Sequence, residues 1–212
     1  MSTTEPAARA APLVPADHGP LGLRERKKLK TRQSIQREAF QLFAEKGFDA
    51  TSVDQIAAAA EVSASTFFRY FPTKEDVVVT EEYDPMLAVA LRARPLDEPI
   101  LDAIRRAVTD LVGQLLAADR EELLFRAHLM ETVPTLRARL MDEQLRSQDA
   151  VSALIAERTG RPPGDLEVTC AAAMIIAISS SVVRHWVRRG GTDDLAELFD
   201  RHLGLLSSGL RL

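Results

Sequence analysis

The sequence is poor in cysteine and in aromatic residues. Cys170 is the single cysteine among 212 residues, which excludes an intramolecular disulfide and suits a reducing cytoplasm. Only 5% of the residues are aromatic, whereas Ala, Leu, Arg and Glu are abundant, a composition typical of helices rather than strands. We therefore expect a soluble cytoplasmic protein of the all-α class, with one large domain or two smaller ones.

Long hydrophobic runs are also lacking. The most apolar stretch, 168–183, is rich in Ala and Ser and is short for a membrane span of about 20 residues, so it predicts a buried helix. Residues 1–23 contain four prolines and no apolar run of signal-peptide length. We expect a disordered N-terminal tail at 1–23, no secretion and no membrane partner.

Motifs that would indicate an enzyme are missing. The sequence has no glycine-rich phosphate loop, no nucleophile motif and no convincing pair of carboxylates. The four histidines are scattered, and His128 with Glu131 is one pair at helical spacing and no more. These absences predict a protein that is not an enzyme and that uses neither a cofactor nor a metal ion.

Charge is distributed unevenly along the chain. The formal net charge is −4, but residues 24–74 hold ten Lys or Arg against six Asp or Glu, including all five lysines. Residues 75–212 hold sixteen Arg against twenty-three acidic residues. A small basic unit on a larger acidic body indicates that one end of the protein meets an anionic partner.

Local signals predict three short or medium helices in the basic unit. A first helix over 24–46 should end at Gly47, since glycine readily adopts the left-handed conformation of a helix end. Ser52 and Gln55 have the spacing of a capping box, and Ser63 is a good N-cap for a helix over 64–71. Pro72 ends that helix, and Thr73 with Asp76 caps a fourth.

Longer helices are predicted after residue 74. We expect them at 74–93 with a bend at Asp84 and Pro85, 98–118, 120–131, 134–159, 165–189 and 192–209. No stretch predicts a strand or an internal repeat. The expected organisation is a tail at 1–23, a three-helix helix-turn-helix unit at 24–73 and a larger helical domain at 74–212.

One short stretch, SASTFFRYF, concentrates aromatic residues among small polar ones. Phe67 and Phe71 are four residues apart and so share a helix face, which we expect to pack on Phe43, Ile56, Ala57 and Val62. The opposite face then carries Ser65, Thr66, Arg69 and Tyr70. This pattern suits a helix that enters a DNA groove, although a core segment with a solvated face has the same pattern.

Neighbouring residues favour the DNA surface. A basic run leads into the first helix and contains Lys28 and Lys30, which suit phosphates. Thr51 and Ser52 lie at a helix start, where backbone N–H groups favour anions, and Lys74 lies at the next helix start.

The stretch GFDATSVDQIAAAAEVSASTFFRYFPTKEDVV resembles the N-terminal domain of the TetR family of transcriptional regulators. The similarity covers roughly residues 26–78, about a quarter of the chain. Two positions depart from the family pattern: Glu61 stands where the turn usually has Gly, and Phe68 stands where Tyr is common. The first departure suggests a strained or differently angled turn, and the second removes a hydroxyl that often reaches a phosphate.

The resemblance implies a set of DNA contacts on double-stranded DNA. Residues in or beside the major groove would be Ala64, Ser65, Thr66, Arg69 and Tyr70, and Phe68 is a further candidate for DNA contact. Arg69 is the candidate for a base contact, because arginine can bind guanine O6 and N7 with two hydrogen bonds. Residues that hold phosphates would be Lys28, Lys30, Thr51, Ser52 and Lys74.

The resemblance also implies a homodimer on a palindromic operator, joined through the last two long helices. The candidate interface residues are Ala173, Ala177, Ser181, Leu195, Leu198, Phe199 and His202. Small residues at four-residue spacing allow close helix approach, and the leucine stripe is apolar. An intrachain core requires the same pattern, so the residues alone leave both readings open.

A small, partly apolar effector is the other partner that the resemblance implies. The candidate lining residues are Phe125, His128, Leu129, Met130, Met174 and Trp186, which suit an adaptable apolar pocket and equally suit a plain core. We expect a repressor that its ligand releases from DNA. The alternatives are an activator of the same fold, a ligand-independent DNA-binding protein, and a non-specific one whose binding would be salt-sensitive.

Overall fold

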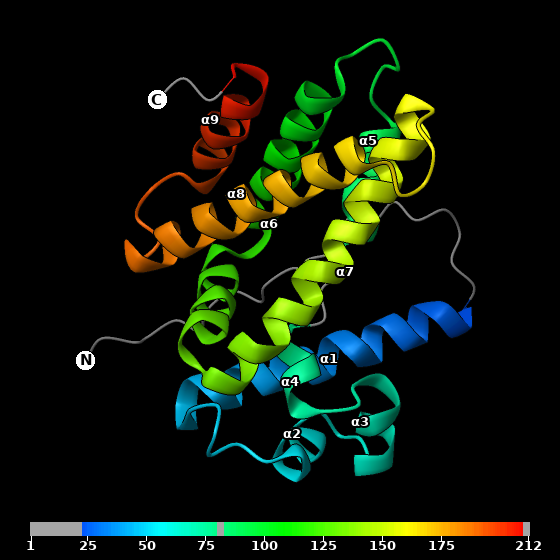
Figure 1. Ribbon diagram of the computed structural model, residues 1–212. Helices are drawn as coiled ribbons and strands as arrows, with labels where there is room; N and C mark the ends of the chain where they lie inside the picture. The colour runs from blue at the N-terminus through cyan, green and yellow to red at the C-terminus, as the bar shows by residue number, and fades with distance from the viewer. Residues whose placement is uncertain (1–22, 80–82, 210–212) are drawn as a thin grey trace.

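The computed structural model describes residues 23–79 and 83–209, and every regular element in these ranges is a helix (Figure 1). The helices are α1 Leu23–Lys46, α2 Val53–Ala59, α3 Ala64–Tyr70, α4 Lys74–Val79, α5 Tyr83–Arg92, α6 Ile100–Thr132, α7 Pro134–Thr159, α8 Leu166–Arg188 and α9 Leu195–Ser207. The predicted all-α class is confirmed. The predicted tail lies, except for Leu23, outside the described residues.

The caps of the first helices are those that the sequence predicts. Gly47 has a φ of +86° directly after α1. The Ser52 hydroxyl accepts from the Gln55 N–H at 3.2 Å, and the Gln55 side chain accepts from the Ser52 N–H at 3.0 Å, which completes the capping box. The Ser63 hydroxyl accepts from the Thr66 N–H at 3.1 Å and starts α3. Local hydrogen bonds therefore fix where these short helices begin.

The turn between α2 and α3 contains a non-glycine residue in the left-handed region. Glu61 has a φ of +54°. Around it, the Val62 N–H donates to the Ala57 carbonyl at 2.9 Å and the Glu61 N–H donates to the Ala58 carbonyl at 3.2 Å, the two bonds of a Schellman motif. Glycine usually occupies this position, because a Cβ in the left-handed region meets a backbone carbonyl oxygen. The strain predicted for this turn therefore has a specific location, the backbone of Glu61.

Two hydrophobic cores hold the molecule together. The lower core joins α1, α2, α3 and α4 to the adjoining ends of α6 and α7 through Leu129 and Leu136. The upper core lies between α5, α6, α7, α8 and α9 and surrounds Trp186. Figure 1 shows α1 to α4 at the base and the other helices above them. The short helix α4 packs against α1, α6 and α7, so it connects the two parts.

The longest helix, α6, is kinked. Asp119 has an extended conformation (φ −159°, ψ 92°) inside it, and its carboxylate accepts from the Glu122 N–H at 2.8 Å, as an N-cap does. The backbone geometry thus divides α6 near the position that separates the two predicted helices 98–118 and 120–131. The lower segment leads down to the α1–α4 unit.

The predicted helix at 74–93 corresponds to α4 and α5 of the structure. Residues 80–82 lie between these two helices and outside the described residues, so the expected bend at Asp84 and Pro85 stays a prediction.

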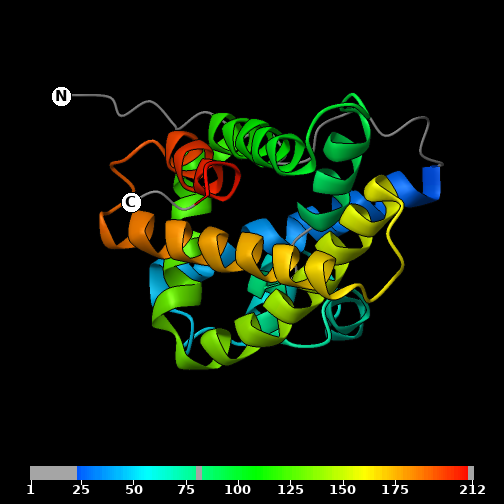
Figure 2. The same ribbon diagram turned by 45° about the horizontal axis from the view of Figure 1, so that its top comes forward.

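Helix α8 crosses the front of the upper part, with α9 packed on α6 beside it (Figure 2). Among the described helices, α8 is long and apolar enough to cross a membrane. It packs against α6, α7 and α9, however, and Ala172, Ile175 and Trp186 belong to the upper core. The packing is that of a bundle helix, as the sequence predicts.

A buried arginine links α6 to α4. Arg126 is 6% exposed, and its Nε donates to the Val78 carbonyl at 2.8 Å. Its guanidinium also lies 5.6 Å from the centre of the Phe40 ring and 6.0 Å from that of Tyr83. One turn earlier, burial raises the pKa of the Glu122 carboxyl, an effect that Asp119 adds to and Arg126 opposes.

We expect Arg126→Met to lower the free energy of unfolding by about 1.5–3 kcal/mol. The substitution keeps an apolar stem of similar length but removes a charged hydrogen bond and leaves the Val78 carbonyl without this donor. Urea denaturation measures the change. Arg137→Met, on the exposed surface of α7, is the control and should stay within about 0.5 kcal/mol of the wild type. Equal stability of the two variants would contradict the role of Arg126.

Glu61→Gly should raise the free energy of unfolding by up to about 1 kcal/mol. Removing the Cβ relieves about 1–2 kcal/mol of left-handed strain, part of which is offset by the greater freedom of glycine in the unfolded chain. Glu61→Ala is the matched control, because it removes the same charge and keeps the Cβ. Thermal or urea unfolding should rank Gly above Ala, and the reverse order would show that the backbone of this turn is not strained.

Candidate functional site

The helix α3 presents a mixed surface that is supported from behind by two buried rings. Phe67 and Phe71 are both 0% exposed and belong to the lower core with Phe43 and Ile56, as predicted. On the other side, Ser65 and Arg69 are exposed. Because a helix of two turns has little stability of its own, these rings are what hold the polar face in place.

The remaining α3 candidates lie beside this face. Phe68 is 51% exposed, and its ring meets the Phe67 ring edge-on at 5.5 Å. Ala64, Thr66 and Tyr70 are half-buried, and the Tyr70 ring lies 5.6 Å from the Arg69 guanidinium. The face is therefore narrow: its exposed members are one hydroxyl, one guanidinium and one aromatic ring.

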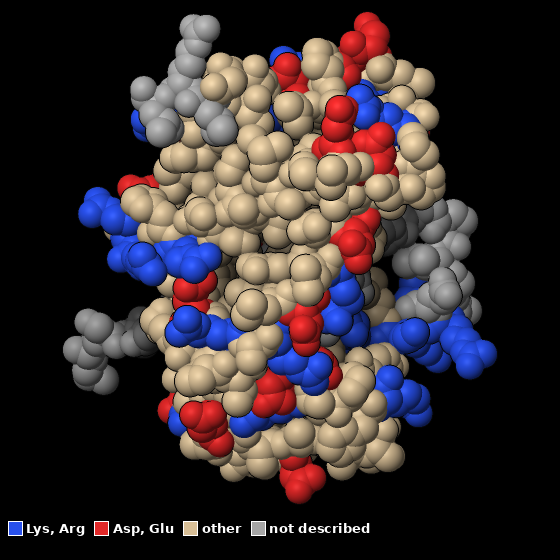
Figure 3. All heavy atoms as spheres, in the orientation of Figure 1, with Lys and Arg blue, Asp and Glu red and all other residues tan. Residues whose placement is uncertain are grey.

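The start of α1 carries exposed cations. Lys28 and Lys30 are exposed, as are Arg24, Arg26 and Lys27. In Figure 3 blue side chains gather where this end of α1 extends beyond the body. Arg32 is oriented differently, since its guanidinium lies 4.4 Å from the centre of the Phe71 ring and donates to the Tyr70 carbonyl at 3.4 Å. Arg32 thus fastens α1 to α3.

Two predicted phosphate contacts have internal partners instead. Thr51 is 2% exposed, and its hydroxyl lies 2.8 Å from the Gly47 carbonyl, to which it donates. The Lys74 ammonium donates to the carbonyls of Phe48 at 2.7 Å and Thr51 at 2.9 Å. Both side chains bind backbone carbonyls of the α1–α2 turn, which corrects the expectation for the buried Thr51. Lys74 is half-buried and its ammonium has a third N–H donor, so its phosphate contact stays a prediction. Ser52 is exposed at the start of α2.

A cavity of about 230 Å³ lies above this unit, between α6, α7 and α8. Its lining residues are Val79, Tyr83, Ala127, Met130, Glu131, Leu140, Glu143, Gln144, Ser147, Ile176, Ser179, Ser180 and Val183. Val79 comes from the end of α4, so the cavity wall and the lower core share a residue. An apolar cavity with a few polar groups is the usual form of a small-molecule site.

Of the six residues predicted to contact a ligand, only Met130 lines the cavity. Phe125 and Leu129 pack in the lower core. Trp186 is 0% exposed in the upper core, where its Nε1 donates to the Asp193 carbonyl at 3.0 Å. His128 is exposed, and Met174 is 44% exposed on α8. These five residues do not line this cavity, and their contact with a ligand stays a prediction.

The cavity residues that sequence analysis missed come from α4, α5, α7 and α8 as well as α6. No motif links them, because they meet only through the angles at which five helices cross. The spacing of apolar residues along one helix shows which residues share a face of that helix. Such spacing could therefore indicate only the part of the lining on α6 that includes Met130.

The predicted dimer residues fall into two groups. Leu195 and Phe199 are 3% and 5% exposed in the upper core, so the structure corrects their assignment to an interface. Ala177 and Ser181 are exposed on α8, whereas Ala173, Leu198 and His202 are half-buried. The His202 Nδ1 lies 2.7 Å from the Leu198 carbonyl in the preceding turn.

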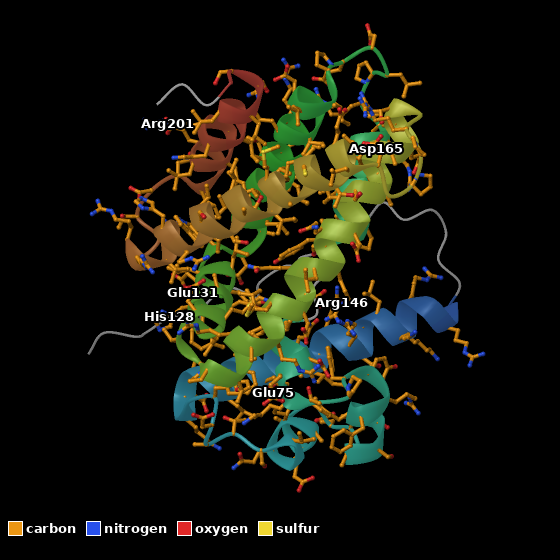
Figure 4. All side chains as sticks on the ribbon, viewed as in Figure 1. Glu75, His128, Glu131, Arg146, Asp165 and Arg201 are labelled. Carbon is orange, nitrogen blue, oxygen red and sulfur yellow. The ribbon has the colours of Figure 1, made fainter. Side chains whose placement is uncertain are left out.

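Metal-binding groups do not cluster in the described ranges, where no three His, Cys, Asp or Glu side chains could hold one ion. His128 and Glu131, the pair with helical spacing, both lie on the lower part of α6 (Figure 4).

Family models match both parts of the chain. The model described as bacterial regulatory proteins of the tetR family matches residues 35–79, and the MftR C-terminal domain matches residues 98–211. The second match alone covers more than half of the chain.

Individual proteins agree with this assignment. The chain is 33% identical to the HTH-type transcriptional regulator TcmR of Streptomyces glaucescens, over 90% of this chain and 85% of TcmR. It superposes on FadR of Thermus thermophilus, a TetR-family repressor solved with lauroyl-CoA, with a TM-score of 0.57 and 26% identity over 85% of this chain and 95% of that one. For FadR of Bacillus halodurans the TM-score is 0.59 and the identity 25%, over 85% and 96%.

These relatives are regulators rather than enzymes, which agrees with the missing catalytic motifs. Taken with an α3 that is held by buried rings behind an exposed polar face, the matches assign the chain to the TetR family of helix-turn-helix, DNA-binding transcriptional regulators.

Proposed function

We propose that the protein is a homodimeric repressor in the cytoplasm that binds a palindromic operator and leaves it when a small, partly apolar ligand enters the body. In this proposal residues 24–73 form the DNA-binding unit and residues 74–212 the effector and dimer domain. The main support is the surface of α3. Its exposed face carries Ser65, Phe68 and Arg69, and the buried rings of Phe67 and Phe71 hold the helix in place.

The exposed face of α3 has the chemistry of a base reader. The Arg69 guanidinium can donate two hydrogen bonds to guanine O6 and N7, and an apolar ring such as Phe68 can contact a thymine methyl group. Ala64, Thr66 and Tyr70 flank these groups, and Ser52, Lys28 and Lys30 are exposed where they can meet phosphates. The exposed cations at the start of α1 supply the electrostatic attraction that an acidic body lacks.

Dimerisation is supported by the outward face of α8. Leu166, Cys170, Met174, Ala177 and Ser181 are all exposed and follow one another at three- or four-residue spacing. Leu166 is 75% exposed, although exposure of a large apolar side chain is unfavourable in water. In Figure 3 the surface over α8 is mainly uncharged. A second copy on this face would cover the row and would make the operator two-fold symmetric.

The cavity supports control by a ligand. The Thermus relative was solved in complex with lauroyl-CoA, which supports an effector for a protein of this fold. Because Val79 of α4 lines the cavity, occupation of the cavity would act on the helix that follows the DNA-binding unit. Repression is the commoner mode among the regulators that the chain resembles, and an activator would use the same contacts with a different operator position.

Selection of binding sites from random duplex DNA, at near-physiological salt, tests the DNA part of the proposal. We expect a palindromic consensus, and Arg69→Ala should remove the preference at one position in each half-site, at a cost of about 1–3 kcal/mol for the preferred base. Arg201→Ala is the control, since Arg201 is exposed on α9 at the opposite end of the molecule (Figure 4). An unchanged consensus for Arg69→Ala would refute its assignment as the base contact.

The double substitution Lys28→Ala and Lys30→Ala should weaken binding to all sequences alike. Each phosphate contact that is lost should lower the slope of log K against log salt by about one, because fewer counterions are released. Anisotropy titrations of labelled duplexes between about 50 and 200 mM salt measure this slope. A selective loss for one sequence, with an unchanged slope, would mean that these lysines do not contact phosphates.

A further inference from the structure

We propose that the cavity selects a compact, largely apolar ligand that carries a hydrogen-bond donor, either an ammonium or a hydroxyl group, and that it rejects anions. The inference rests on the proposed effector function and specifies the chemistry of the ligand. It follows from the atoms that the cavity wall presents.

The larger part of the wall is apolar. Ala127 and Met130 of α6, Leu140 of α7, and Ile176 and Val183 of α8 all contribute to it. The volume of about 230 Å³ is below the range of roughly 300–1,000 Å³ typical of drug-sized ligands. A rigid one- or two-ring molecule therefore suits this space better than a long flexible chain.

Three neutral polar side chains of the wall, those of Gln144, Ser179 and Ser180, present acceptors. The hydroxyls of Ser179 and Ser180 donate to the carbonyls of Ile175 and Ile176, both at 2.8 Å, so their protons are already used. Because the Ser180 proton is engaged, the Gln144 Nε2 must be the donor in its 2.8 Å bond to the Ser180 oxygen. The amide oxygen of Gln144 is then left to accept.

Two carboxylates add negative charge to the same wall. Glu143 is already paired with Arg146, whose Nε lies 3.0 Å from it. Glu131 is half-buried and makes neither an ion pair nor a hydrogen bond with any residue in 23–79 or 83–209. No Lys, Arg or His is among the described residues that line the cavity. Figure 4 shows Glu131 on α6 and Arg146 on α7.

These charges decide which ligands can enter. An anion would lose its hydration and meet two carboxylates, of which only Glu143 is offset by a cation, Arg146. A ligand ammonium or hydroxyl would instead supply the donor that Glu131 lacks. The cavity thus differs in its charge requirement from a site for fatty acyl-CoA, whose phosphates are anionic.

Three probes with the same ring system test the inference: 1-naphthylmethylamine, 1-naphthylmethanol and 1-naphthoate. Calorimetry or ligand-observed NMR on the full chain without DNA should detect the amine and the alcohol, with Kd values in the millimolar range or tighter. The naphthoate should bind at least tenfold more weakly than either. If the amine alone binds, the donor is an ammonium, and if the two bind alike, the donor need not be charged.

The substitution Glu131→Gln tests whether the Glu131 carboxylate causes the preference for the amine over naphthoate. The variant should lose at least tenfold in affinity for the amine and gain affinity for naphthoate, because it removes a charge and adds an N–H donor. Glu121→Gln, on the exposed surface of the same helix, is the matched control and should leave all three affinities unchanged. Urea unfolding of each variant shows whether it is folded under the conditions of the titration.

Two results would overturn the inference. The first is binding of naphthoate or lauroyl-CoA as tight as that of the amine, and the second is the absence of binding by any probe at millimolar concentration. Either result would leave the operator selection untouched, because that experiment contains no ligand. Conversely, a failed operator selection with normal probe binding would count against the regulatory proposal and not against the chemistry of the cavity.

Discussion

Backbone carbonyl groups of α4 connect the two parts of the molecule, because they accept hydrogen bonds from both parts. Here the Val78 carbonyl accepts from Arg126 of α6 at 2.8 Å, and the Val77 carbonyl accepts from Gln36 of α1 at 3.4 Å. The side chains of both valines are 0% exposed in the lower core. Helix α4 is therefore held on one side by the DNA-binding unit and on the other by the body, and it cannot shift without exchanging these bonds.

The same contacts connect the cavity to the DNA-binding unit. Val79 and Tyr83 line the cavity on either side of the α4–α5 connection, and the Arg126 guanidinium lies near both the Tyr83 ring and the Phe40 ring of α1. A ligand that displaces Tyr83 would act on the side chain that holds α4. Coupling free energies between sites are typically about 1–3 kcal/mol, and one charged hydrogen bond contributes about 1.5–3 kcal/mol. A change in this single contact is thus large enough to couple the two sites.

Sequence reasoning succeeded where a few adjacent residues decide the outcome. The caps at Ser52 and Ser63 and the left-handed Gly47 need only neighbours within three or four positions, so they could be predicted. The cavity could not be, because its wall combines residues from α4 to α8 and depends on how these helices cross. Trp186 shows the difficulty: a large ring on an apolar helix suits a pocket or a core equally, and only its bond to the Asp193 carbonyl and its full burial distinguish the two.

Thr51 and Lys74 show why polar residues near a DNA surface are hard to assign. A hydroxyl and an ammonium can satisfy phosphates, but they can equally satisfy backbone carbonyls at the end of a helix. Here the chain ends α1 at Lys46 and turns sharply, so the carbonyls of Gly47, Phe48 and Thr51 need donors. Lys74 comes from the start of α4 and spans this gap. The bonds that close the α1–α2 turn therefore also attach it to α4, the helix whose other end reaches the cavity.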